Sequence, residues 1–159
     1  KEVVLRKQQG RIKELKLLNK AIRETKQKNM VIMGDFNLDS NDMKKYPELK
    51  LSPEYKYKNI YDVWKLFKPK LYGATEDELI NTFRSSMKIK PVPERRRARY
   101  DKILYKGANI FPVKIKMIGN KKINKRVQII GKTKNKEKKK RMCYLFPSDH
   151  FGLYASFRI

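Results

Sequence analysis

The sequence predicts an α+β fold in which helices pack on sheets, and two patterns of apolar residues support this prediction. Apolar side chains recur at helical spacings over residues 3–27, so one face of a long helix can pack while its lysines and arginines stay in water. The apolar run at 30–33 is typical of a buried strand, and the alternation at 110–118 and 153–159 is typical of strands with one buried face. With 159 residues, the chain is long enough for one domain, or part of one, and too short for two of ordinary size.

Two further elements are predicted from segments that contain both aromatic and acidic residues. YDVWKLF at 61–67 predicts a short helix that ends before Pro69. RYDKILY at 99–105 predicts a sheet strand, with apolar residues following its aspartate. Strands therefore dominate the second half of the chain and helices are interposed in the first, which favours layers of helices on sheet.

Three connecting segments are interpreted from local signals. Thr75 with Glu78 three residues later has the form of a capping box, which predicts that a helix starts there. NTFRSS at 81–86 is interpreted as a short strand. The lysine-rich tract GKTKNKEKKKR at 131–141 has low complexity and is interpreted as an insertion loop.

The composition favours a polyanionic partner and an intracellular chain. The formal net charge is +25, and lysine and arginine contacts to nucleic acid release counterions from its phosphates. Lysine is spread through all predicted elements, so a general lysine bias is the alternative explanation. No stretch approaches the roughly 20 apolar residues of a bilayer span, so we expect no membrane partner. The single cysteine, Cys143, cannot form an internal disulfide and is interpreted as a small buried hydrophobic residue.

The motif GDFN places Asp35 directly after the predicted strand at 30–33, at the rim of a sheet. Its carboxylate can accept a proton from water, and the amide of Asn37 can donate to a phosphoryl oxygen, so the pair is a plausible half of a hydrolytic site. The alternative is an Asx-turn without a catalytic role.

Two later motifs add an aspartate and the only histidine of the chain. In RYD, Asp101 precedes apolar strand residues and needs a partner, which is either an arginine at 95–97 or 99 or a histidine whose tautomer it fixes. In PSDH, His150 follows Asp149 just before the last predicted strand. Asp149 could bind a hard cation while His150 reaches a scissile phosphate.

The order GDFN, then RYD before an apolar strand, then SDH before a closing strand resembles the endonuclease/exonuclease/phosphatase family. Within that family the likeness is to the 5′-tyrosyl-DNA phosphodiesterases, through PSDHFGL at 147–153, RYDKIL at 99–104, DVW at 62–64 and the pair Thr82 and Phe83. The resemblance implies the C-terminal half of a four-layer α/β sandwich of the DNase I-like type. Residues 1–159 would then form the C-terminal portion of one domain, with the lysine-rich insertion at 131–141.

The resemblance also implies a role for each of five side chains. Asp35 would orient or deprotonate the attacking water, and Asn37 would hold the phosphate. His150 would stabilise the phosphoryl transition state, and Asp101 would orient His150. Asp149 would belong to the metal shell or its surroundings, and the implied metal is Mg²⁺, with Mn²⁺ as the alternative.

Family members carry further site residues in a first half that has no counterpart in this sequence: an asparagine, the main metal-binding glutamate and a second histidine. We therefore expect the missing N-terminal half of the same domain to be a partner. With Asp149 as the one metal ligand, Mg²⁺ affinity should be weak, and we expect the isolated chain to be inactive.

The expected function is Mg²⁺-dependent hydrolysis of phosphodiester bonds in nucleic acid, DNA rather than RNA, and most specifically of 5′-phosphotyrosyl-DNA in DNA repair. The alternatives are a general endonuclease or abasic-site nuclease, and a noncatalytic basic fragment that binds nucleic acid. The resemblance alone implies a nuclear location.

Overall fold

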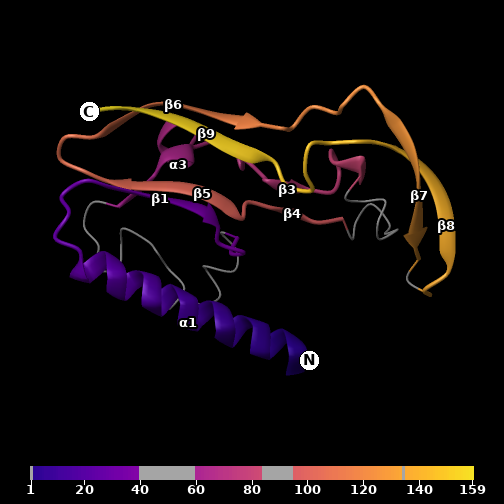
Figure 1. The fold of residues 1–159 in the computed structure, drawn as a ribbon, viewed down its shortest axis with the longest axis horizontal. Helices are drawn as coiled ribbons and strands as arrows, with labels where there is room; N and C mark the ends of the chain where they lie inside the picture. The colour runs from indigo at the N-terminus through magenta and orange to yellow at the C-terminus, as the bar shows by residue number, and fades with distance from the viewer. Residues whose placement is uncertain (1, 40–59, 84–94, 134) are drawn as a thin grey trace.

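The computed structural model describes residues 2–39, 60–83, 95–133 and 135–159, and Figure 1 shows a long helix lying along two layers of strands. The helices are α1 (Glu2–Glu24) and α3 (Val63–Phe67). The strands are β1 (Met30–Asp35), β2 (Tyr61–Asp62), β3 (Glu76–Asp77), β4 (Arg97–Ala98), β5 (Asp101–Lys106), β6 (Phe111–Ile118), β7 (Arg126–Lys132), β8 (Lys138–Tyr144) and β9 (Gly152–Arg158).

The central strand of the fold is β5, which pairs antiparallel with β1 on one side and with β2 on the other. Its side chains alternate between two packing layers, as strand geometry requires. Ile103 shares a buried cluster with Val63 of α3 and Ile115 of β6. Leu104, on the opposite side of the sheet, shares a buried cluster with Ile22 of α1. The layers are therefore α1, the β1–β5–β2 sheet and the β6–β9 sheet (Figure 1).

Two smaller strand pairs lie outside these layers. The short strands β3 and β4 pair antiparallel with each other, and β4 directly precedes β5 in the sequence. Strands β7 and β8 form a long antiparallel hairpin, which extends from one end of the molecule beyond the main sheets (Figure 1). In the sequence the hairpin lies between β6 and β9, and these two strands pair directly with each other in the structure.

The structure confirms the main predicted elements. The helix predicted over 3–27 is α1, and the strand predicted after it is β1. The helix predicted in YDVWKLF is α3, which begins at Val63 because Asp62 caps it. The Asp62 Oδ1 atom accepts hydrogen bonds from the backbone N–H groups of Trp64 and Lys65 at 3.0 and 3.3 Å. Within the described parts of the chain, no helix is both long and apolar enough to cross a membrane.

The helix predicted to start at Thr75 is wrong, because the next two residues form strand β3. The Thr75 hydroxyl is not available as a helix cap, since it accepts hydrogen bonds from the backbone N–H groups of Tyr100 and Asp101. Asp77 caps the following turn instead. The strand predicted at 81–86 is wrong at Thr82 and Phe83, which are helical, and its remainder lies outside the described residues.

The lysine-rich tract at 131–141 forms the far end of the β7–β8 hairpin rather than an insertion loop throughout. Gly131 pairs with Lys139, and Lys132 pairs with Lys138. The β-branched residues that favour a strand lie mainly in β7, so the composition of the tract alone could not predict the pairing. Cys143, at the base of the hairpin, is buried and has a free thiol, as expected.

Gly73→Ala should destabilise the protein by about 3 kcal/mol, because the cost of a left-handed backbone for alanine adds to the cost of a steric clash. The φ angle of Gly73 is +69°, and a Cβ atom there would lie 2.3 Å from Cε2 and Nε1 of Trp64. Urea denaturation measures the free energy of unfolding. The fluorescence of Trp64, the single tryptophan, reports displacement of its ring.

The matched control is Gly10→Ala, in α1, where a Cβ atom would meet no described atom within 4 Å apart from the helix's own backbone. This change should raise the free energy of unfolding by about 0.5–1 kcal/mol, because alanine favours a helix over glycine. Equal stabilities for the two variants would contradict the packing described for Gly73.

Candidate active site

Two carboxylates meet where strands β1 and β5 pair at one end of their ladder. In the antiparallel register Asp35, the last residue of β1, lies opposite Asp101, the first residue of β5. Side chains directly opposite each other in such a pair are close neighbours, and like charges there are destabilising. The register of β1 on β5 therefore brings two of the sequence-predicted site residues together, at a place that favours a cationic or hydrogen-bonding partner.

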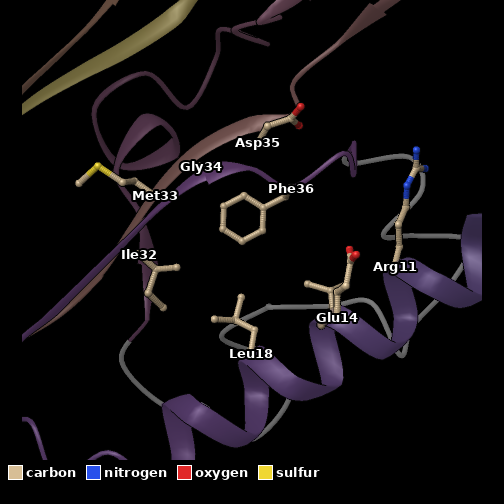
Figure 2. A pocket seen from close by; sticks show the side chains of 9 residues that line it. Arg11, Glu14, Leu18, Ile32, Met33, Gly34, Asp35 and Phe36 are labelled. Atoms are coloured by element: carbon tan, nitrogen blue, oxygen red, sulfur yellow. The ribbon is translucent and has the colours of Figure 1, made fainter.

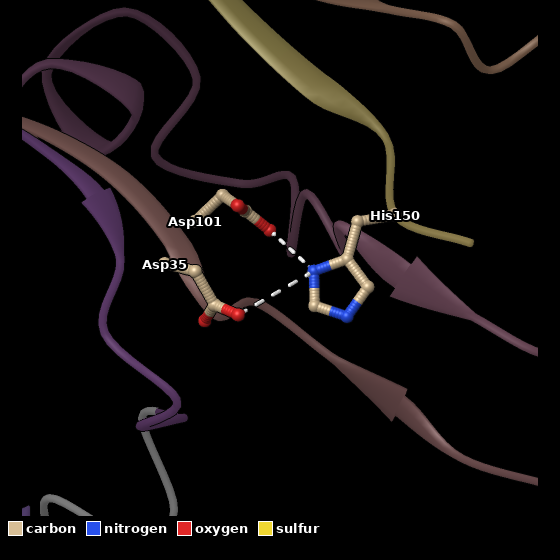
Figure 3. A group of neighbouring side chains, drawn as sticks. All are labelled: Asp35, Asp101 and His150. Atoms are coloured by element: carbon tan, nitrogen blue, oxygen red, sulfur yellow. Dashed lines mark hydrogen bonds and ion pairs between the residues drawn. The ribbon is translucent and has the colours of Figure 1, made fainter. Parts of the chain in front are cut away.

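The partner is His150, carried by the segment between β8 and β9. Its Nδ1 atom lies 3.0 Å from Asp101 Oδ2 and 4.0 Å from Asp35 Oδ2. Figure 3 shows both contacts on Nδ1, with Nε2 turned away from Asp101. The three side chains are partly exposed, at 23% for His150, 24% for Asp101 and 38% for Asp35, so a ligand can reach them.

Asp101 therefore pairs with His150 and not with a nearby arginine, the other partner considered from the sequence. Each of three arginines has an acidic partner elsewhere: Arg96 pairs with Glu76, Arg97 with Asp77 and Arg99 with Asp62. The hydrogen bond between His150 and Asp101 is the arrangement that orients an imidazole and fixes its tautomer.

Asp35 is also part of an Asx-turn, which was one interpretation of the GDFN motif; the catalytic role of Asp35 and Asn37 stays a prediction. Its Oδ1 atom accepts a hydrogen bond from the backbone N–H of Asn37 at 2.7 Å, while Oδ2 faces His150. Asn37 has a positive φ of 50° and an exposed side chain. The turn fixes the Asp35 carboxylate and presents the Asn37 amide to solvent beside it.

The structure does not bring the Asp149 carboxylate into this group. Its Oδ1 atom lies 3.3 Å from Ser148 Oγ, which donates to it. Its backbone carbonyl accepts a hydrogen bond from Asn81 Nδ2 at 3.4 Å. The role of Asp149 as a metal ligand stays a prediction, and the geometry favours other residues for it.

The three residues Asp35, Asp101 and His150 could hold a metal ion. Each offers one ligand atom, and these atoms all lie within 4.8 Å of one another. Carboxylate oxygens suit hard cations such as Mg²⁺ and Mn²⁺, and imidazole nitrogen suits softer transition metals. The donor set fits a divalent cation, and Asp35 is the better oxygen ligand because Asp101 Oδ2 already lies at hydrogen-bonding distance from His150.

A cavity of about 260 Å³ lies between α1 and the end of β1, and Asp35 is among its lining residues. Leu18, Ile32 and Phe36 are among its lining residues, and Figure 2 shows the Phe36 ring lying in it. The Asp35 carboxylate points away from α1 in the same view. The cavity is therefore the imperfectly filled contact between helix and sheet behind the site.

Thr75 positions two of the three site segments at once, which the sequence did not indicate. Its Oγ1 accepts hydrogen bonds from the backbone N–H groups of Tyr100 and Asp101, both at 3.1 Å. Its carbonyl accepts one from the N–H of Phe151, next to His150, at 2.7 Å. The Thr75 side chain is fully buried. It thus joins the start of β5 to the histidine segment.

The histidine segment has two further supports outside the predicted site. Asn81 Nδ2 donates to the carbonyl of Ser148 at 2.8 Å, and Thr82 Oγ1 donates to the carbonyl of Tyr144 at 3.3 Å. Ser148 Oγ accepts from the N–H of His150 at 3.3 Å. The one sequence signal for this support was Thr82, through the Thr82 and Phe83 pair in the family resemblance.

Arg99 and Lys102 hold the GDFN loop against β5. Arg99 Nη2 donates to Asp62 Oδ2 at 2.7 Å, and its backbone N–H donates to Asp39 Oδ1 at 3.1 Å. Lys102 Nζ donates to the carbonyls of Leu38 and Arg99. Burial, and then the charge of Arg99, lower the pKa of Lys102 to about 8.

The chain is similar in sequence and in fold to one group of known proteins. No family model matches the chain. The chain is 28% identical over 155 residues to tyrosyl-DNA phosphodiesterase 2 (TDP2) of Gallus gallus, a match that covers 94% of this chain and 34% of that protein. The solved structure of D. rerio TDP2 complexed with a single-strand DNA product matches with a TM-score of 0.61 and 22% identity, over 94% of this chain and 50% of that one.

Truncated Caenorhabditis elegans TDP2 matches with a TM-score of 0.57 and 18% identity, over 94% of this chain and 48% of that one. The resemblance to the endonuclease/exonuclease/phosphatase family is confirmed. The described helices and strands form part of a DNase I-like fold. The chain spans about a third of the length of the curated TDP2 relative and about half of these solved TDP2 structures.

Thr75→Val should lower the free energy of unfolding by about 2 kcal/mol, because two N–H groups lose their acceptor in a buried place. Chemical denaturation measures this loss. Thr75→Ser is the control, since it keeps the hydroxyl and should cost less than half as much. If the serine and valine variants lose the same stability, the hydroxyl is not what joins these segments.

Lys102→Met should change how stability depends on pH. The folded-state pKa of Lys102, about 8, lies below its ordinary value of 10.5, so burying the charged form is a cost below pH 8. That cost disappears as pH rises towards 10.5. Between pH 8 and pH 10.5, the free energy of unfolding of the wild type should rise on the order of 3 kcal/mol relative to that of Lys102→Met. Denaturation of both proteins at several pH values tests this, and a stability difference independent of pH would contradict it.

Proposed function

We propose that the chain is the C-terminal part of a metal-dependent phosphodiesterase that hydrolyses phosphodiester bonds in DNA, most specifically 5′-phosphotyrosyl bonds in DNA repair. The observation that carries the proposal is the contact of His150 Nδ1 with Asp101 beside Asp35. Three segments far apart in the sequence converge there on a partly exposed acid–imidazole group. The likeness to tyrosyl-DNA phosphodiesterase 2 supports the choice of reaction.

His150 stabilises the phosphoryl transition state, and Asp101 positions it. With the Nδ1 proton donated to Asp101 Oδ2, the imidazole ring is held in one orientation. In the protonated ring Nε2 also carries a hydrogen and donates to a phosphoryl oxygen, where negative charge increases during attack. The Asp101 carboxylate stabilises the positive charge of that ring.

Asp35 and Asn37 act on the opposite side of the reaction. Asp35 Oδ2 is exposed enough to hold the attacking water and accept its proton, while Oδ1 stays fixed in the Asx-turn. The exposed Asn37 amide donates to a phosphate oxygen. In-line attack needs little covalent help from the protein, so most of the rate arises from positioning and charge stabilisation.

Mg²⁺ or Mn²⁺ is the proposed metal, and it would lie beside the acidic group formed by Asp35 and Asp101, with Asp149 in its surroundings. The chemistry that such an ion would supply is positive charge next to the phosphate oxygens. The same proposal includes the N-terminal half of the domain as a partner, because the chain spans only about half of the solved structures that it matches.

Two other functions are distinguished by substrate. A general endonuclease or abasic-site nuclease would use the same group on an internal phosphodiester. A noncatalytic fragment would bind nucleic acid through its net charge of +25 without cutting it. The name of the Gallus gallus relative favours the tyrosyl bond, and the D. rerio structure holds a DNA product.

The decisive experiment measures Mg²⁺-dependent release of tyrosine from a 5′-tyrosyl oligonucleotide by this chain and by a version extended upstream. We expect activity in the extended version, abolished by a chelator and restored by Mg²⁺. His150→Ala should lower kcat by about 10³-fold and Asp101→Asn by about 10²-fold, because each removes stabilisation of the transition state.

DNA affinity should be almost unchanged in both variants, which separates catalysis from binding. Cleavage of internal phosphodiesters without tyrosine release would assign the general nuclease. Binding without hydrolysis in either version would assign the noncatalytic fragment. Activity that survives His150→Ala would reject the role given to this histidine.

A further inference from the structure

The β7–β8 hairpin has two different faces. In its antiparallel register, alternate residues share a face. On one face, Val127 and Ile129 are half-buried and Gly131 and Cys143 are buried, while Lys139 and Arg141 of the same face are exposed. The opposite face, which we call the outer face, consists of Arg126, Gln128, Ile130, Lys132, Lys138, Lys140, Met142 and Tyr144, and all of these except the half-buried Tyr144 are exposed.

The outer face concentrates positive charge without internal compensation. Lys132 lies directly opposite Lys138, a like-charge pair that destabilises a two-stranded ribbon. Glu137, in the connecting turn, is the single acidic residue between 121 and 144. Over the described part of the chain, no basic side chain of this hairpin takes part in an ion pair. An external polyanion would relieve this repulsion.

The base of the outer face carries cations held over an aromatic ring. Lys122 Nζ lies 4.0 Å from the centroid of the Tyr144 ring, and the guanidinium carbon of Arg126 lies 5.4 Å from it. Such contacts hold both cations close to the same surface. The positive charge therefore continues from the far end of the hairpin down to Tyr144.

The same end of the hairpin is attached to the candidate active site. The carbonyl of Tyr144 accepts a hydrogen bond from Thr82 Oγ1, and the carbonyl of Ser148 accepts one from Asn81 Nδ2. One turn of the chain thus holds both the base of the hairpin and the segment that carries His150. From Tyr144 to Lys138 the strand extends about 20 Å, at roughly 3.4 Å per residue. Figure 1 shows the hairpin projecting from the body.

We propose that the outer face of the β7–β8 hairpin is an arm that binds the phosphate backbone of nucleic acid outside the candidate active site, along the roughly 20 Å from Tyr144 to Lys138. The inference rests on the proposed function for its substrate. Alternate residues such as Lys138 and Lys140 are roughly 6.8 Å apart along the strand. The outer face therefore presents a row of cations that can contact several phosphates of one DNA strand. The arm would make binding depend on substrate length, because a short oligonucleotide held at the candidate active site does not reach the far end of the arm.

The test uses the variant Lys132→Gln, Lys138→Gln, Lys140→Gln, measured by fluorescence anisotropy on labelled oligonucleotides of roughly 6 and roughly 24 nucleotides. Affinity for the long DNA should fall about tenfold or more at moderate salt. The slope of log K against log[salt] should become shallower by about 2, because phosphate contacts are lost. Affinity for the short DNA should stay within about twofold.

The matched control is Lys13→Gln, Lys16→Gln, Lys26→Gln, which removes the same charge from exposed positions on and just after α1. It should leave the long-DNA affinity within about twofold, apart from the general effect of net charge. Unchanged Trp64 fluorescence in both variants verifies that each is folded.

Three outcomes would overturn the proposal. The two triple variants could lose equal affinity for DNA, or the hairpin variant could lose equal affinity for short and long DNA. In the third outcome, the hairpin variant loses affinity for phosphatidylserine vesicles and keeps its affinity for DNA. The last would assign the arm to a membrane surface. Failure of the proposed function is distinguishable, because it would appear as absent tyrosine release in every version. A hairpin-specific loss of long-DNA binding would then still support the arm.

Discussion

The antiparallel register of β1 on β5 is the constraint on which the site depends. It places Asp35 opposite Asp101 at the end of the ladder, and a slip by one residue would turn one of these side chains to the other face of the sheet. The register is fixed by burial on both sides of β5, with Ile103 directed to the β6–β9 sheet and Leu104 to α1. Core packing and the chemistry of the site are therefore set by the same pairing.

Two neighbouring carboxylates repel each other. Buried polar side chains that do not belong to the candidate active site hold Asp35 and Asp101 in place. Thr75 fixes the start of β5 and the histidine segment, and Arg99 and Lys102 hold the loop that follows Asp35. Each of these hydrogen bonds adds little stability by itself. Its loss would be costly, because a buried polar group would then have no hydrogen-bond partner. Among the residues that the structure describes, Arg99 Nη1 is a buried donor without a hydrogen-bond partner.

Local patterns were enough to predict the strands that carry Asp35 and Asp101 and to single out His150, because periodicity and chain order are properties of the sequence itself. They failed for Thr75, which looks like a helix cap. Its actual partners lie 25 and 26 residues away, and no local pattern reports them. They failed also for the lysine-rich tract, whose strand conformation is set by its neighbour β7. Tertiary hydrogen bonding and cross-strand pairing are what the sequence could not supply.

The distance along the chain between the site residues has a consequence for partly folded forms. Asp101 and His150 are 49 residues apart, and what joins their segments is the contact through Thr75 and the docking of β9 on β6. If β9 detaches while the β1–β5 ladder stays intact, the imidazole leaves the carboxylates. A molecule in that state retains much of its secondary structure and its positive charge but has no assembled reactive group. Local opening would therefore leave a chain that still attracts polyanions but is chemically inert towards them.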